Sequence, residues 1–134
     1  MKTILHKDEN GKNVLTHIAS GDENLILQEL GGLFVEQGSV NIEYLNAYNS
    51  SNGGISIDLE KAREIKIEQI RKERDNLFID FDRRFDIAFK DESDLSELRQ
   101  ERQKLKNAPQ KAEEMLDSCI DLQEIDSLTL EHLI

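Results

Sequence analysis

Two of the three histidines, the single cysteine and a group of aspartates are the side chains of this 134-residue sequence that could do chemistry. His6 and His17 lie in neighbouring β-prone runs. If those runs pair, the two rings would be diagonal neighbours on one face, close enough to share a metal ion. The sequence identifies no third ligand. We therefore interpret them as strand histidines near water and expect no metal site.

The aspartates and the cysteine also lack the companions that catalysis requires. On a helix Asp80 and Asp82 would point in different directions, and no histidine or glutamate completes a cluster with them and Asp86. Cys119 excludes an internal disulfide because it is the only cysteine, and it lies on an apolar spacing without a histidine partner. A solvated acidic face and a buried thiol in a reducing compartment are the favoured interpretations.

Ligands that carry phosphate are also disfavoured. Gly31-Gly32 and Gly53-Gly54 lack the lysine or third glycine of a phosphate-binding loop. The net charge of −11 repels nucleic acid and anionic lipid. The chain turns polar after five residues, too early for a signal peptide, and no apolar run has membrane length. We expect a soluble cytoplasmic protein that is not an enzyme, with no catalytic residues, no metal, no cofactor, no direct nucleic-acid partner and no membrane partner.

The start of the chain has the pattern of a β-hairpin. Two β-prone runs, 2–7 and 12–18, flank Asn10-Gly11, the pair favoured in a type I′ turn. That turn would place Glu9 opposite Lys12. In this register His6 and His17 share one face of the hairpin.

A short helix and two further strands are predicted next. SGDENLILQELGG has the capping-box spacing of Ser20 and Glu23 and ends at Gly31-Gly32, which predicts a helix of two to three turns. LFVEQGSVNIEYL predicts a second pair of short strands around Gln37-Gly38. The fold class is therefore α+β, and residues 1–50 form a small ββαββ-type lobe.

A long helix follows a linker. NAYNSSNGGIS is rich in turn formers and places the linker at 51–57. Asp58 is a good N-cap, and no strong breaker follows until about Lys90. Such a helix would be about 48 Å long.

The long helix should fold back into an antiparallel helical hairpin over residues 58–108. Asp94 and Glu97 have capping-box spacing, and the second helix that they start should end near Pro109. Residues 109–134 are expected to form one or two short helices. From residue 111 onward this terminal segment carries seven acids against one lysine.

An apolar stripe on the long helix requires cover. Its apolar side chains gather on one side of a helical wheel, and four of the five phenylalanines lie between residues 78 and 89. Arg63 and Arg74 interrupt the stripe in its N-terminal half. The facing helix offers little apolar surface in return, only Leu95, Leu98 and Leu105.

The stripe is either the core of the hairpin or a binding surface. Roughly 400 Å² of uncovered apolar area would forgo on the order of 10 kcal/mol, comparable to the stability of a small domain. The β lobe, the terminal segment, a second copy of the chain or a foreign protein could supply the cover, and we favour an oligomer or a protein partner. The predicted partner-binding residues are Ile70, Leu77, Phe78, Phe81, Phe85 and Phe89.

In order and spacing, four stretches resemble a group of small tailed-bacteriophage proteins often encoded beside tail-fibre genes and described as tail-fibre assembly chaperones. They are MKTILHKDENGKNVLTHI, LNAYN, IDLEKAREIKIEQIRKERDNLF and ELRQERQKLKNAP, and together they span most of the chain. The sequence departs from the related ones at Tyr48, where tryptophan is frequent, and at Lys106-Asn107, where they carry an arginine-aspartate pair.

The resemblance implies a non-enzymatic role in folding, trimerising or attaching a fibre. The partner would be a tail-fibre or other tail protein, the helical arm would be the contact element, and the location would be the host cytoplasm during phage assembly or the virion tail. Two alternatives stay open. One is a structural adaptor retained in the tail. The other is an acidic inhibitor of a host or defence protein that imitates nucleic acid with Glu113, Glu114, Asp117 and Asp121.

Overall fold

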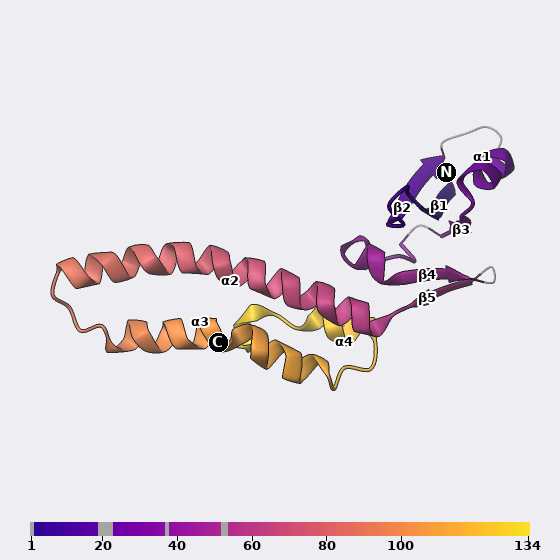
Figure 1. Cartoon of the computed structure of the whole chain (residues 1–134). Helices are drawn as coiled ribbons and strands as arrows, with labels where there is room; N and C mark the ends of the chain where they lie inside the picture. Colours follow the sequence, from indigo (N-terminus) through magenta and orange to yellow (C-terminus); the bar gives the residue numbers. More distant parts are fainter. Residues whose placement is uncertain (1, 19–22, 37, 52–53) are drawn as a thin grey trace. The chain divides into compact units, whose positions relative to one another are not determined.

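The computed structural model describes residues 2–18, 23–36, 38–51 and 54–134. The chain divides into two compact units, Met1–Ala62 and Arg63–Ile134. The first contains small antiparallel sheets and the second contains a helical hairpin with short terminal helices (Figure 1). The α+β class predicted from the sequence is confirmed.

The first hairpin forms where it was predicted, but its turn is longer. β1 (Lys2–Lys7) and β2 (Asn13–Ile18) pair antiparallel. The Asp8 carboxylate accepts hydrogen bonds from the amides of Asn10 (2.8 Å) and Lys12 (2.9 Å), and the Asp8 amide donates to the Lys12 carbonyl (2.8 Å). Asp8 thereby closes a loop of three residues.

The register predicted from Asn10-Gly11 is therefore wrong by one residue. Within this loop only Gly11 has a positive φ, at 75°, whereas a type I′ turn requires two such residues. Lys7 lies opposite Asn13, and Glu9 does not pair with Lys12. A shift of one residue moves alternate side chains to opposite faces of a sheet.

β1 is the central strand of a three-stranded sheet of order β2-β1-β3. Its Ile4 and Leu5 are fully buried. α1 (Glu23–Leu30) contacts β1 and ends at Gly31, as predicted, while the expected capping residue Ser20 lies outside the described residues. A Cβ on the next residue, Gly32, would collide with the backbone carbonyl of Leu5, so the close approach of the chain to β1 requires glycine there.

Only one strand of the predicted second pair exists in this stretch. β3 (Leu33–Val35) pairs with β1, whereas Ile42–Ala47 forms a short 3-10 helix, η1, instead of a strand. The Asn41 side chain caps η1 by accepting a hydrogen bond from the Glu43 amide (3.0 Å). Such local capping by asparagine competes with strand pairing, which explains the error. Gln37, where the turn was expected, lies outside the described residues.

A separate two-stranded sheet occupies the stretch where an irregular linker was expected. β4 (Tyr48–Ser51) and β5 (Gly54–Ile57) pair antiparallel. Asn13 ties β2 to the start of β4, because its side-chain amide donates to the carbonyls of Leu45 (2.9 Å) and Tyr48 (2.7 Å).

α2 (Leu59–Lys90) is one continuous helix of 32 residues, about 48 Å long. Asp58 caps its N-terminus as predicted, since the carboxylate accepts hydrogen bonds from the amides of Glu60 (3.0 Å) and Lys61 (3.3 Å).

The C-terminus of α2 has the hydrogen bonds of a Schellman motif. The Ser93 amide donates to the Ala88 carbonyl (2.9 Å), and the Glu92 amide donates to the Phe89 carbonyl (3.2 Å). Glu92 adopts a φ of 56°, in the left-handed region where this motif usually has glycine. The turn of the hairpin therefore contains a strained residue.

α3 (Ser96–Leu116) begins after Asp94, whose carboxylate accepts a hydrogen bond from the Ser96 amide (3.0 Å). Hydrogen bonds from Ser96 lower the pKa of Asp94. The ionised Asp94 carboxylate therefore stabilises the folded protein at neutral pH. This stabilisation is lost as the pH falls through the lowered pKa of Asp94.

The prediction that α3 ends near Pro109 is wrong. The helix continues through Pro109 to Leu116, and its axis changes direction along its length (Figure 1). A proline inside a helix costs about 3 kcal/mol because it removes a hydrogen bond and crowds the preceding turn. Burial of the face around it offsets this cost. That face consists of Leu105, Ala108, Pro109, Ala112 and Leu116.

Two short terminal helices follow, as predicted: α4 (Leu122–Ser127) and the 3-10 helix η2 (Leu130–His132). Asp121 caps α4 by accepting a hydrogen bond from the Glu124 amide (2.8 Å).

Replacing Glu92 by glycine should stabilise the protein by about 1 kcal/mol, because glycine adopts the left-handed conformation without the clash of a Cβ. Urea denaturation measures the change in the free energy of unfolding. Glu92→Ala is the matched control, since it removes the same charge and keeps the strain. Equal stability of the Gly and Ala variants would contradict the strain assigned to this turn.

Candidate functional site

The terminal segment, residues 117–134, supplies much of the missing cover for the hairpin. It runs back between α2 and α3 (Figure 1). Four of its side chains are buried: Ile125, Leu128, Leu130 and Leu133. Part of the predicted demand for apolar cover is thus met within the chain.

Arg63 and Lys66 of α2 hold this segment in place. The Arg63 guanidinium donates to the Leu116 carbonyl through Nε (2.9 Å) and to the Cys119 carbonyl through Nη2 (2.8 Å). The Lys66 Nζ donates to the Asp126 carbonyl (3.1 Å) and is largely buried. Leu116 is the last residue of α3, Cys119 lies in the turn that follows it, and Asp126 lies in the last turn of α4. A cation is favoured at the C-terminal end of a helix because the helix dipole is negative there.

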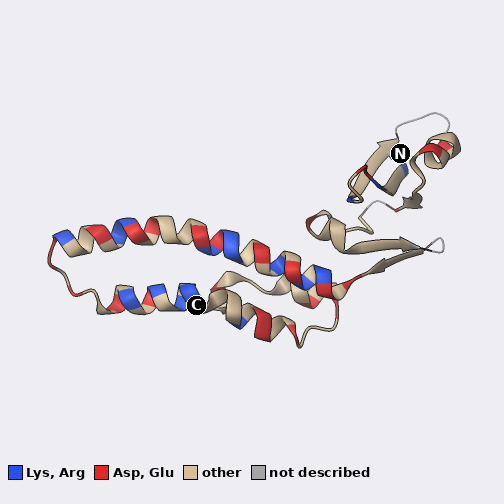
Figure 2. Ribbon diagram, viewed as in Figure 1, with Lys and Arg blue, Asp and Glu red and all other residues tan. Residues whose placement is uncertain are grey.

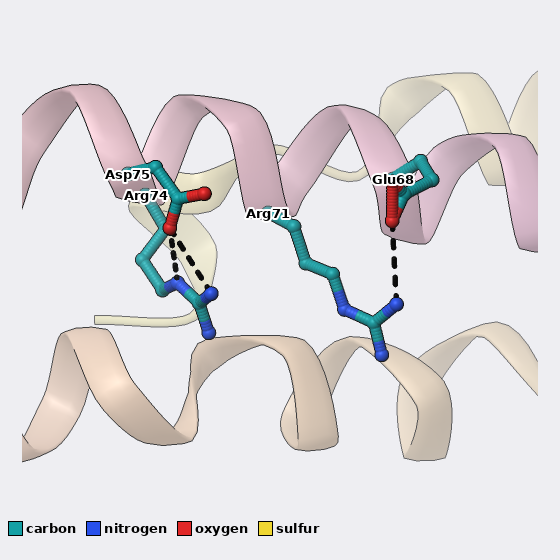
Figure 3. A network of polar contacts seen from close by, with 4 residues as sticks. All are labelled: Glu68, Arg71, Arg74 and Asp75. Atoms are coloured by element: carbon teal, nitrogen blue, oxygen red, sulfur yellow. Dashed lines mark hydrogen bonds and ion pairs between the residues drawn. The ribbon is translucent and has the colours of Figure 1, made fainter.

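Arg74, the second residue that interrupts the stripe, contacts an aromatic ring. Its guanidinium carbon lies 5.7 Å from the centre of the Phe78 ring, and that of Arg102 on α3 lies 5.6 Å from the same centre. Arg74 also pairs with Asp75, and Arg71 pairs with Glu68 (Figure 3). The two arginines of the stripe are therefore parts of the hairpin's packing.

The six predicted partner-binding residues divide by exposure. Ile70 and Phe81 are about 1% exposed and face the interior. Phe78 and Phe85 are half-buried, and the Phe85 ring centre lies 6.2 Å from that of Phe81. Leu77 and Phe89 are exposed, by 42% and 65%. Of the six, the residues that present surface to a partner in this fold are Leu77, Phe78, Phe85 and Phe89. Their role in binding stays a prediction.

Two isoleucines outside the predicted set are exposed at the same end of α2. Ile79 is 73% and Ile87 is 55% exposed. They lie on the outer side of the helix, whereas Phe89 is nearer the side that faces α3. We call Ile79, Phe85, Ile87 and Phe89 the turn-end surface. The sequence could have indicated the exposure of Ile79 and Ile87, because on a helical wheel both lie outside the apolar stripe.

Charged residues of both signs surround the turn-end surface (Figure 2). Asp80 pairs with Arg83 (3.0 Å) and Arg84 (3.4 Å), and Lys90 pairs with Asp86 (3.0 Å). These exposed pairs contribute little to stability. They also account for two of the three aspartates that could have suggested a metal site.

Two grooves accompany the exposed apolar residues. One, of about 470 Å³, is at the hairpin turn and is lined by Phe89, Lys90, Glu92, Ser93 and Leu95. The other, of about 310 Å³, lies between α2 and the terminal segment. Its lining residues are Glu73, Asn76, Leu77, Leu130, Glu131 and Ile134.

The side chains that could do chemistry are occupied in hydrogen bonds. Because of the shifted register, His6 and His17 lie on opposite faces of the sheet. His6 Nε2 hydrogen-bonds the Thr16 hydroxyl (2.7 Å), and His17 Nδ1 hydrogen-bonds the Thr3 hydroxyl (2.8 Å). The earlier placement of both rings on one face is wrong. In the described part of the chain no group of three or more possible ligands could hold a metal ion.

Cys119 is half-buried, and its Sγ donates a weak hydrogen bond to the Met115 carbonyl (3.6 Å). Burial, and secondarily the nearby Glu124 carboxylate, raises the pKa of the thiol. A thiol with a raised pKa is a poor nucleophile at neutral pH.

Among the described residues, no helix has the length and apolar character needed to cross a membrane. No protein-family model, curated protein or solved structure matches the chain.

Removing the Arg63 anchor should destabilise the second unit. In Arg63→Gln the carbonyls of Leu116 and Cys119 lose their charged donor, which should cost about 2 kcal/mol in the free energy of unfolding. Arg71→Gln removes the same charge from an exposed ion pair and should cost less than about 0.5 kcal/mol. Urea denaturation compares the two variants, and amide hydrogen exchange should be accelerated from Leu116 to Ile134 in the first variant only. Similar losses in both variants would refute the anchoring role.

Proposed function

We propose that this chain is a non-enzymatic assembly chaperone, or accessory protein, of a phage tail fibre, and that it binds apolar surface of its partner through the turn-end surface. The single observation that carries the proposal is the exposure of Ile79, Ile87 and Phe89 near the turn of a hairpin whose other half is covered by its own chain. The order of sequence motifs supports the identity of the partner.

The energetics favour a bound state of this surface. Fully burying a large apolar side chain contributes about 1.5–3 kcal/mol. The turn-end residues are already partly buried, so each would contribute on the order of 1 kcal/mol in a complex. Because the exposed isoleucines and Phe89 lie on different sides of α2, a partner that covers all three must reach around the end of the hairpin.

The surrounding charges suit a reversible contact. Mixed ion pairs at the rim keep the free protein soluble, and they contribute more to register and association rate than to affinity. A chaperone must release its client, so a modest apolar surface with a charged rim fits this role better than an extended dry interface would.

Phe89→Asp and Ile87→Asp should each abolish co-purification of the cognate tail-fibre protein when the two are co-expressed, because a carboxylate cannot be buried against an apolar partner without a large cost. Both positions are exposed, so thermal unfolding should be nearly unchanged. Ile120→Asp is the matched control, since Ile120 is 75% exposed and lies outside the turn-end surface. Phe81→Asp is unsuitable because Phe81 is buried.

The proposal fails if fibre trimers form equally well without this chain and the fibre never co-purifies with it. Light scattering on the purified chain reports whether a second copy covers the surface instead. Mass spectrometry of purified particles distinguishes a chaperone, which should be absent or substoichiometric, from an adaptor that stays in the tail.

An acidic inhibitor is the second candidate. Four acids of α3 and the terminal segment are exposed and, within the described residues, make no ion pair: Glu113, Glu114, Asp117 and Asp121. Affinity that collapses with added salt, and loss of activity when these acids are neutralised, would favour this role over the chaperone.

A further inference from the structure

The groove between α2 and the terminal segment is a packing gap in the middle of the hairpin. On a helical wheel Leu77 lies about 20° from Ile70 and about 40° from Phe81, both of which are about 1% exposed. Leu77 nevertheless remains 42% exposed. Its exposure therefore does not follow from its side of the helix. It arises because the terminal segment leaves the groove open at this position.

The floor of the groove is apolar and firmly placed. Leu130 is about 5% exposed and cannot move without disturbing the core, while Leu77 and Ile134 form partly exposed walls. At about 310 Å³ the groove is at the small end of ligand sites, large enough for one or two side chains.

The rim of the groove is acidic. Glu73 and Glu131 line it from its two sides, one on α2 and one on η2. Across the described chain neither carboxylate has an ion pair or side-chain hydrogen bond, whereas Glu68 and Asp75 on α2 are paired. From α3, Lys111 Nζ lies 3.5 Å from the Leu133 carbonyl and donates to it.

We propose that this groove binds a segment of a protein partner in which an apolar side chain of about the size of leucine is followed within one helical turn by lysine or arginine. The apolar side chain fills the space over Leu130, and the cation lies between Glu73 and Glu131. The two carboxylates and the net charge of −11 disfavour a nucleotide or an anionic lipid in the same place. The inference goes beyond the proposed function, since it concerns a second contact surface and does not require the partner to be a fibre.

A fluorescein-labelled helical peptide with leucine and lysine spaced one turn apart is a suitable probe, titrated with the full chain and followed by fluorescence anisotropy. It should bind, and binding should weaken with salt. Two matched peptides, one with serine for leucine and one with glutamate for lysine, should each bind at least about fivefold more weakly. Each test measures one half of the proposed recognition.

On the protein side, Glu73→Gln with Glu131→Gln should weaken binding of the basic peptide at least about fourfold, because each carboxylate should contribute about two- to fivefold. Glu113→Gln with Glu114→Gln is the matched control, because it changes the net charge equally and lies outside the groove. This control should stay within about twofold of the unaltered chain. Leu77→Ser should weaken the basic peptide without altering the salt dependence.

Equal losses in the two double variants would overturn the proposal, because binding would then reflect the overall charge of the chain. Undiminished binding of the serine peptide, or of the basic peptide to Glu73→Gln with Glu131→Gln, would also overturn it. So would light scattering that shows a dimer dissociated by Leu77→Ser, which would assign the groove to a second copy. The peptide assay contains no fibre, so a negative result in it leaves the proposal for the turn-end surface standing. If the peptide binds but the fibre protein is not captured, only the proposal for the turn-end surface is removed.

Discussion

The second unit depends on two cations placed on carbonyl groups. Arg63 binds the carbonyls of Leu116 and Cys119 at and just beyond the end of α3, and Lys66 binds the carbonyl of Asp126 in α4. Together they fasten the terminal segment to α2. A hairpin of α2 and α3 alone could not bury the apolar stripe, because α3 offers few large side chains in return. The anchored segment brings Ile125, Leu128 and Leu130 into the same core. Arg63 and Lys66, one helical turn apart on α2, thus determine where the terminal segment begins to pack against the hairpin.

This anchoring at one end produces an uneven hairpin. The segment is fastened near the start of α2 and runs back between the helices, so its cover is concentrated in that half. Toward the turn α2 faces α3 alone, and there Ile79, Ile87 and Phe89 are exposed. The turn itself contains Glu92 in a left-handed conformation, which adds local strain to the half of the hairpin that is least covered. Regions with few buried apolar contacts are the ones from which proteins draw surfaces that bind and release partners.

The elements that could be predicted are those determined by local signals. Asp58 caps α2, Gly31 ends α1, and the long helix has no breaker within it, so sequence alone places them. The errors arose where a nearby side chain or the core overrode the local signal. Asp8 closes a three-residue loop that displaces the register expected from Asn10-Gly11. Pro109 is retained in α3 because the buried face around it offsets the lost hydrogen bond.

The candidate site was less predictable than the fold, because exposure depends on where the terminal segment ends its cover. A helical wheel ranks Ile70, Leu77 and Phe81 alike, and the structure separates them: two are enclosed, and Leu77 borders a groove. Arg63 looked like an interruption of the stripe because its partners, the carbonyls of Leu116 and Cys119, are more than fifty residues away in sequence. Every residue has a backbone carbonyl, so the pattern of residue types does not show which carbonyl will accept a hydrogen bond from a side chain. A basic residue inside an apolar helical stripe therefore indicates that a helix C-terminus, as well as a carboxylate or an aromatic ring, has to be sought opposite it.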